Sequence, residues 1–292
     1  MPYDRSMHRF LLHNDQIRDT SELLLMPGQV GFLNGWGVFS TIRVFDGILF
    51  AYERHWTRMN RDAKLLRVPM PLDAEQLEKQ LLSLVEANKA HNATLRVAIV
   101  RNRGGLFEGP AVARDYDIIA FTTNVNAWGK GVKLGVVPQA RHAGSPFAGT
   151  KMLSWSFNLT WYETAHENGF DEVVLLNERD EVSECTSANI FAAKGNEVWT
   201  PPLESGCLPG ITRELLLGEI HVPDYRVIEK RLTLSDLAEA DEVFITSTTR
   251  ELLPVISIEG IEVKQCDKAR MALQNAFSRF VDEYVAAKTS VA

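Results

Sequence analysis

The sequence has little of what usually marks a secreted, metal-binding or membrane protein. Its 292 residues include only three cysteines, whose positions fit neither a disulfide framework nor a metal-ligand spacing. We therefore expect a reducing cytoplasm and no bound metal. No apolar run approaches the roughly 20 residues that a membrane-spanning helix needs. The net charge of −7 argues against nucleic acid or an anionic membrane as a partner.

The sequence also lacks a dinucleotide-binding fingerprint, internal repeats and low-complexity tracts. Its glycine-rich segment, residues 31–37, does not have the GxGxxG spacing and no helix is expected after it, so no dinucleotide site is expected there. What is present is the composition of an ordinary globular protein, with 45% apolar and 24% charged residues. The length allows one large domain or two modest ones.

Hydrophobic periodicity predicts a chain that mixes helices and strands. Helical spacing of apolar residues predicts helices over residues 53–66, 73–90 and 269–288. Strand-like segments bounded by turn residues lie between residues 8 and 50 and at 94–101, 115–125, 170–177, 181–191 and 197–200. Asp46-Gly47 predicts a two-residue hairpin turn. On the C-terminal helix, Met271, Ala276, Phe277 and Phe280 are expected in the core.

The residues NAWGKG resemble a connection between domains. We therefore expect a small N-terminal domain of residues 1–122, a linker of residues 123–132 and a larger C-terminal domain of residues 133–292 that carries Lys151.

One segment, residues 151–213, combines an amine, a carboxylate and an anion-binding turn. Lys151 follows a loop rich in glycine, serine and proline, and precedes a helical pattern that includes Trp155, Leu159 and Tyr162. Glu184 lies in a strand pattern, where its carboxylate must find a cationic partner or take up a proton. The predicted strand face carries Val182, Glu184, Thr186, Ala188 and Ile190.

The end of this segment is a glycine-containing turn, residues 208–212, ahead of a helical pattern. Such a turn offers backbone N–H groups and the positive end of a helix dipole to an anion. An amine, a partly buried acid and an anion site together suit pyridoxal 5′-phosphate. The lysine would form a Schiff base, the acid would pair with the pyridinium nitrogen and the helix start would hold the phosphate.

Each of these features also has an ordinary structural explanation. A single lysine is usually a solvated surface residue, and a strand glutamate often pairs with a nearby arginine. A glycine turn often simply joins a loop to a helix. The residues taken one by one therefore leave both interpretations open.

The order of the motifs along the chain resembles one family. The segments NGFDEVVLLN, EVSECTSANIF, VWTPPLESGCLPGITR and DEVFITSTTRELLPVISIEG are similar to those of the class IV, fold-type IV pyridoxal-phosphate enzymes. That family includes branched-chain aminotransferases, D-amino acid aminotransferases, (R)-selective amine transaminases and aminodeoxychorismate lyases. The resemblance runs from about Asn14 to Ile261. It implies a two-domain α/β (α+β) structure of fold-type IV and a homodimer.

The resemblance also implies which residues form the site. Lys151 would be the catalytic lysine, and the other residues at the cofactor would be Arg58, Trp155, Glu184, Ile211, Thr212 and Thr248. The implied substrate contacts are Phe39, Arg96, Arg101 and Thr249. Arg58 suits a phosphate because its planar guanidinium donates several hydrogen bonds. Trp155 stands where many branched-chain enzymes have a tyrosine, and its indole N–H could donate there or its ring could only pack.

The substrate stays open at this point. The motifs TSTTRELLPVISIEG and LPGITRELLL favour transfer between a branched-chain-like L-amino acid and a 2-oxo acid. The motif FSTIRV, in which Ser40-Thr41 differs from the Glu-Gly of typical branched-chain enzymes, and Arg101 lean toward the pyruvate-releasing lyases. Arg101 also matches the carboxylate-binding arginine of D-amino acid aminotransferases, whereas Arg96 aligns with a pocket arginine of branched-chain enzymes. A catalytically weak, regulatory cofactor-binding dimer is a further alternative, against which the intact Lys151 argues.

Overall fold

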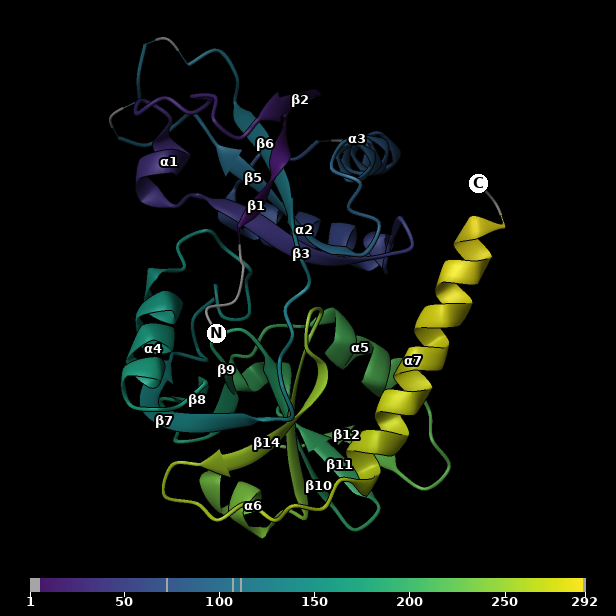
Figure 1. Ribbon diagram of the computed structural model, residues 1–292. Coiled ribbons are helices and arrows are strands. Elements are labelled where there is room, and N and C mark those ends of the chain that lie inside the picture. Colours follow the sequence, from purple (N-terminus) through teal and green to yellow (C-terminus); the bar gives the residue numbers. More distant parts are fainter. Residues whose placement is uncertain (1–5, 72, 107, 111, 291–292) are drawn as a thin grey trace. The chain divides into compact units, whose positions relative to one another are not determined.

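The computed structural model describes residues 6–71, 73–106, 108–110 and 112–290. These residues form two compact units, each built on one β-sheet (Figure 1). The first unit consists of the described residues of Met1–Ala127, Thr150–Trp155 and Tyr284–Ala292, and the second of Trp128–Gly149 and Ser156–Glu283. Lys151 belongs by its contacts to the first unit. The division into a domain of residues 1–122, a linker of residues 123–132 and a domain of residues 133–292 stays a prediction.

The first unit is built on an antiparallel sheet with the strand order β2-β1-β6-β5-β3-β4. Its strands are β1 (Met7–His13), β2 (Gln16–Asp19), β3 (Gly37–Phe45), β4 (Ile48–Leu49), β5 (Ala93–Arg101) and β6 (Tyr116–Thr123). The predicted hairpin between β3 and β4 is confirmed, because Val44 pairs with Leu49. Asp46 and Gly47 between them have φ angles of 47° and 82°. Positive φ at both positions is typical of a type I′ turn.

Two helices, α2 (Tyr52–Leu66) and α3 (Ala74–Ala87), pack against one face of this sheet. Alternation along β3 places Val38, Ile42 and Val44 in the core with these helices and Phe39 on the opposite face. Asp73 caps α3 by accepting two backbone N–H groups, so the predicted helix begins just after its cap. The glycine-rich segment contains a short helix, α1 (Val30–Asn34), that the sequence did not predict.

The second unit is built on a mixed sheet with the strand order β12-β11-β10-β13-β14-β7-β8-β9. Its strands are β7 (Val132–Arg141), β8 (Glu172–Asn177), β9 (Val182–Cys185), β10 (Asn189–Lys194), β11 (Glu197–Thr200), β12 (Arg226–Glu229), β13 (Glu242–Ser247) and β14 (Glu251–Ile258). Strand β7 runs parallel to both neighbours, and β11 runs parallel to β12. In the core, the Phe191 and Phe244 rings stack with their centres 5.2 Å apart on paired strands.

The helices of the remaining chain are α4 (Ser156–Glu167), the 3₁₀ turn Leu203–Ser205, α5 (Ile211–Gly218), α6 (Leu234–Glu239) and α7 (Lys268–Thr289). The first turn of α7 is capped by the buried carboxylate of Glu242, which accepts the N–H groups of Ala269 and Arg270. In the described part of the chain, none of the helices combines the length and the apolarity needed to cross a membrane.

The single strand predicted over residues 181–191 is wrong, because the structure contains two strands there, β9 and β10. Between them, Thr186 and Ser187 turn toward the buried carboxylate of Glu172, which accepts hydrogen bonds from both hydroxyls and from the Thr186 N–H. This turn interrupts the alternation of side chains. The predicted common strand face from Val182 to Ile190 therefore does not exist.

Two smaller expectations also differ from the structure. Trp155 lies just before α4 rather than within it, because its ring packs edge-on against Phe39 of the first unit. On α7, Ala276 and Phe277 are buried as predicted, whereas Phe280 is half-buried and Met271 is 44% exposed.

Candidate active site

Lys151 lies beside β3 in the first unit, with both of its backbone polar groups bonded. Its N–H donates to Asp62 Oδ2 over 3.0 Å, and its carbonyl oxygen accepts the N–H of Phe39 over 3.1 Å. The next residue, Met152, forms an antiparallel bridge with Val38. The Lys151 amine lies over the Phe39 ring, 4.7 Å from its centre. Two hydrogen bonds and a strand bridge therefore hold the backbone at Lys151, while its amine lies over the Phe39 ring.

Three of the predicted site residues gather around Lys151 on the sheet face opposite α2 and α3. The Arg96 guanidinium lies 3.8 Å from the centre of the Phe39 ring and 6.0 Å from that of Trp155. The Phe39 and Trp155 rings meet edge to face with their centres 6.1 Å apart. Burial lowers the pKa of the Arg96 guanidinium. An arginine flanked by two rings in a partly dry environment is well suited to bind a carboxylate.

Arg101 has a different environment. Its Nε donates to the carbonyl oxygen of Arg103 and its Nη1 to that of Arg67, both over 2.7 Å. Its guanidinium also stacks on Trp36 at 4.1 Å from the ring centre. Two of its three nitrogens are thus committed to backbone carbonyl groups.

Arg58 lies on the helix-facing side of the sheet, inside a small polar group. Its Nη2 donates to Ser40 Oγ over 2.9 Å, and the same hydroxyl lies 2.7 Å from His55 Nδ1. Burial, followed by the positive charges of Arg58 and Lys151, holds the pKa of His55 well below its usual range. His55 is therefore neutral at physiological pH, and the Ser40 hydroxyl links it to the guanidinium of Arg58.

Sequence reasoning missed His55 and Asp62, although their spacing contained a signal. Together with Arg58 they occupy positions i, i+3 and i+7 of α2, which places all three on one side of a helix. That side is buried, and the three residues are 1%, 7% and 1% exposed. A polar stripe at this spacing is usually a solvated surface, and only the packing of α2 on the sheet shows that it is internal.

Glu184 lies on β9 in the second unit, with both carboxylate oxygens engaged. Oε1 accepts from Arg141 Nε over 3.3 Å, and Oε2 accepts the N–H of Leu208 over 2.9 Å. Arg141 also donates to Asn158 Oδ1 over 3.0 Å, which holds the guanidinium in place. The Glu184 side chain is 12% exposed and that of Arg141 is 19% exposed. The cationic partner that the sequence required for Glu184 is therefore Arg141, which sequence reasoning did not identify.

The predicted anion site at the start of α5 has uncapped backbone N–H groups. Ile211 and Thr212 form its first turn, and no side chain in the described part of the unit caps the helix at Gly210. The Asn189 amide donates to the Leu208 carbonyl oxygen over 2.8 Å, and a side chain at Gly210 would collide with Asn189 Oδ1. A larger residue at Gly210 would therefore have to displace the Asn189 side chain of β10, which supports this turn.

Thr248 and Thr249 form the turn between β13 and β14, and the neighbours of this turn hold it. The Thr249 carbonyl oxygen accepts from Trp128 Nε1 over 2.8 Å, and the Arg250 guanidinium stacks on the same indole at 3.9 Å. Arg250 Nη2 in turn lies 3.4 Å from the fully buried carboxylate of Glu172. A buried ion pair and a tryptophan therefore determine the course of the backbone at the two threonines.

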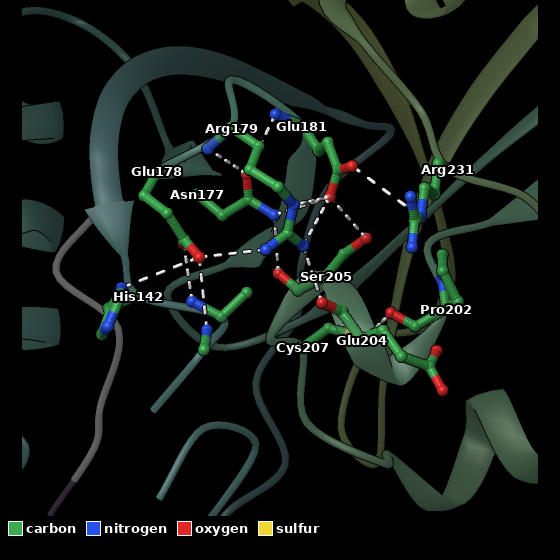
Figure 2. A network of polar contacts seen from close by, with 12 residues as sticks. His142, Asn177, Glu178, Arg179, Glu181, Pro202, Glu204, Ser205, Cys207 and Arg231 are labelled. Atoms are coloured by element: carbon green, nitrogen blue, oxygen red, sulfur yellow. Dashed lines mark hydrogen bonds and ion pairs between the residues drawn. The ribbon is translucent and has the colours of Figure 1, made fainter. Parts of the chain in front are cut away.

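A polar network in the second unit connects the loop at Ala143 and Gly144 with the segment at Glu204 (Figure 2). The Glu178 carboxylate accepts the N–H groups of Ala143 and Gly144, in the loop that precedes Lys151. Arg179 bonds to Glu178, to Glu181 and to the carbonyl oxygen of Glu204, in the segment that precedes α5. The hydrogen bond from Arg179 lowers the pKa of Glu181. His142 lies at the edge of this network with its side chain 73% exposed.

Comparison with known proteins gives one consistent result. A family model described as "Amino-transferase class IV" matches residues 37–258. A putative branched-chain-amino-acid aminotransferase of Methanocaldococcus jannaschii is 32% identical, with 85% of this chain and 88% of that protein aligned. A D-alanine aminotransferase of Bacillus licheniformis is 30% identical, with 86% and 88% aligned. Among solved structures, the PLP-bound form of a hypothetical aminotransferase from Mycobacterium tuberculosis has the same fold, with a TM-score of 0.83, 21% identity, and 94% and 99% of the two chains covered.

Proposed function

Because the chain belongs to the class IV aminotransferase family, whose members use pyridoxal 5′-phosphate, we propose that it moves an amino group from a branched-chain-like L-amino acid to a 2-oxo acid. The observation that carries this proposal is the group around Lys151. An amine with a fixed backbone lies over the Phe39 ring, which also contacts the Trp155 ring and the partly buried Arg96. The rings suit an apolar side chain, and the arginine suits the carboxylate of an amino or oxo acid.

The residues present fit the cofactor. Glu184 is held by Arg141 and the Leu208 N–H, and its carboxylate would suit a protonated pyridine nitrogen. The uncapped N–H groups of Ile211 and Thr212 suit the phosphate, and so do the guanidinium of Arg58 and the hydroxyl of Thr248. We assign Lys151 to the covalent bond with the cofactor's aldehyde carbon.

The chemistry then follows from what each group can do. Pyridoxal phosphate, when bound, accepts the electron pair that remains on the substrate's α-carbon once that carbon loses its proton. The Lys151 amine would remove that proton and deliver it on the other side of the transferred nitrogen, at the carbon that the cofactor's aldehyde provides. Glu184 holds a proton on the ring nitrogen throughout. Arg96 holds the substrate carboxylate, and the turn at Thr249 offers a second contact. Water would release the 2-oxo acid by supplying its carbonyl oxygen and leave the amino group behind, and a second 2-oxo acid would take up that amino group by the reverse steps, with loss of water.

We assign Trp155 a packing role in this site. Its ring meets Phe39 edge to face and lies near Arg96, so it contributes an apolar wall beside the lysine. A tryptophan at this position narrows the space available to a substrate side chain more than a tyrosine does.

A series of amino donors tests the proposal directly. The visible absorbance of the cofactor-loaded protein should fall on addition of L-leucine or L-glutamate and return with 2-oxoglutarate. Loss of the band with D-alanine alone would instead place the protein with the D-specific enzymes. Release of pyruvate from aminodeoxychorismate, with no response to simple donors, would make it a lyase. A protein that takes up no cofactor would contradict all three.

The same series, run on two matched variants, separates the two candidate arginines. Arg96→Met should raise the KM for the amino donor by about 10- to 100-fold, the scale of a lost hydrogen bond to a charged group. Arg101→Met should change KM by less than about 3-fold, because Arg101 bonds to the carbonyl oxygens of Arg67 and Arg103. The reverse ranking would move the carboxylate contact to Arg101.

We further propose that the protein is a homodimer of the cytoplasm. Phe32, Leu33 and Leu106 of the first unit are 53%, 59% and 75% exposed, which suits a surface covered by a second copy. All three cysteines are free thiols, which suits a reducing compartment. Sedimentation equilibrium should give twice the mass of one chain, and a monomer would contradict the dimer. Cell fractionation would test the location.

A further inference from the structure

The buried side of α2 carries a carboxylate whose role the proposed reaction does not include. Asp62 is 1% exposed, and its two oxygens have separate partners. Oδ1 accepts from Arg61 Nε over 2.8 Å and also from Arg61 Nη2, whereas Oδ2 accepts the N–H of Lys151 over 3.0 Å. Arg61 lies at the edge of the site with its side chain 45% exposed. The buried carboxylate of Asp62 therefore pairs with the half-exposed Arg61 and accepts a hydrogen bond from the backbone N–H of Lys151.

The Lys151 N–H needs such an acceptor. The segment from Lys151 to Leu153 runs beside the first half of β3, where the Lys151 carbonyl oxygen bonds to Phe39 and the Leu153 N–H to Gly37. In this pairing the N–H of Lys151 bonds to Asp62 rather than to β3. A buried N–H without an acceptor destabilises the folded protein, because the group has lost its hydrogen bond to water. Asp62 satisfies this group by accepting its hydrogen through a carboxylate oxygen over 3.0 Å.

We propose that Asp62 is a positioning residue for Lys151. The carboxylate on α2 holds the backbone of Lys151 and thereby sets the position of its reactive amine. Two hydrogen bonds therefore hold the Lys151 backbone, one donated by its N–H to Asp62 and one accepted by its carbonyl oxygen from Phe39. Together they fix the direction in which the side chain leaves the backbone toward the Phe39 ring. A catalytic group displaced by about 1 Å can lose about 100-fold in rate. This inference rests on the proposed function, in which Lys151 binds the cofactor.

Two variants test this role. In Asp62→Asn an amide oxygen can still accept the Lys151 N–H, but the charge is lost and the amide nitrogen faces Arg61. In Asp62→Ala the acceptor is removed. The matched control is Asp73→Ala, which removes the exposed cap of α3 and touches no residue of the site. The control should lower the melting temperature and leave every measurement at Lys151 unchanged.

The first readout is hydrogen–deuterium exchange of the peptide that contains the Lys151 amide. We expect exchange to be faster by at least about 10-fold in Asp62→Ala and by less in Asp62→Asn, because a lost hydrogen bond of about 1.5–3 kcal/mol raises local opening by that factor. The second readout is the fraction of pyridoxal phosphate trapped on Lys151 by borohydride, which should fall in the same order. The third is kcat at saturating substrate, which should fall by about 10- to 100-fold in Asp62→Ala with little change in KM.

The outcomes separate this inference from the proposed function. Unchanged exchange at Lys151 in a folded Asp62→Ala protein would overturn the role of Asp62, whatever the activity. Equal defects in Asp62→Ala and Asp62→Asn at all three readouts would also overturn it, because the asparagine retains an acceptor. A wild-type protein that traps no pyridoxal phosphate on Lys151 would instead refute the proposed function and leave the exchange result valid.

Discussion

Replacing Lys151 with alanine should abolish transamination, with a fall in kcat of about 10⁴-fold or more, because the proton transfer at the α-carbon loses its base and the cofactor loses its covalent attachment. The variant should still fold. Both hydrogen bonds that hold this position, to Asp62 and from Phe39, involve the backbone of Lys151, which alanine keeps. Turnover with L-leucine and 2-oxoglutarate, together with the visible absorbance of the loaded protein, measures the effect.

A suitable control for this change is Lys130→Ala, at an exposed lysine in the turn before β7. This variant should keep the activity and the visible absorbance of the wild type. The melting temperature of Lys151→Ala should stay within a few degrees of that of the control. Full activity in Lys151→Ala would refute the assignment of the catalytic lysine, whereas an unfolded variant would refute the argument that the backbone contacts suffice.

Replacing Glu184 with glutamine should lower kcat by about 10²- to 10³-fold, the scale on which one preorganised electrostatic partner contributes. Glutamine keeps an oxygen for the Leu208 N–H but has no charge to keep a proton on the pyridine nitrogen. The change should also lower the free energy of unfolding by about 3–5 kcal/mol, because the largely buried Arg141 loses its ion-pair partner. Steady-state kinetics and urea unfolding measure the two effects separately.

Glu181→Gln is a matched control for this variant. The Glu181 side chain is 13% exposed, close to the 12% of Glu184, and it also pairs with an arginine, Arg179. Glu181→Gln should therefore lose stability and keep kcat within about 3-fold, because Glu181 has no assigned contact with the cofactor. If both variants lowered kcat equally, the loss at Glu184 would be an effect of stability. If Glu184→Gln kept full kcat, Glu184 would not be the partner of the ring nitrogen.

The family and the type of most elements could be predicted from the sequence, and the assignment of Lys151 as the reactive lysine stays a prediction. These properties depend on local patterns: the alternation in β3, the Asp46-Gly47 turn and the ordered motifs from Lys151 to Arg213. The hairpin was confirmed, and so was the family. The prediction was wrong where a distant residue overrode the local pattern. Glu172 on β8 accepts hydrogen bonds from Thr186 and Ser187, which form a turn between β9 and β10. No local feature of residues 181–191 predicts this interruption of the strand.

The tertiary structure alone decided which partners these residues have. Arg141 reaches Glu184 across 43 positions of the chain, and Asp62 reaches the Lys151 backbone across 89. The sequence left open which of the two arginines of β5 would meet a substrate carboxylate. In the structure Arg96 lies with Phe39, whereas Arg101 is bonded to the carbonyl oxygen of Arg67. The physical reason is that the periodicity of a strand or helix determines on which of its faces a residue lies. Which groups it meets there depends on strand register and helix packing, which are properties of the folded chain.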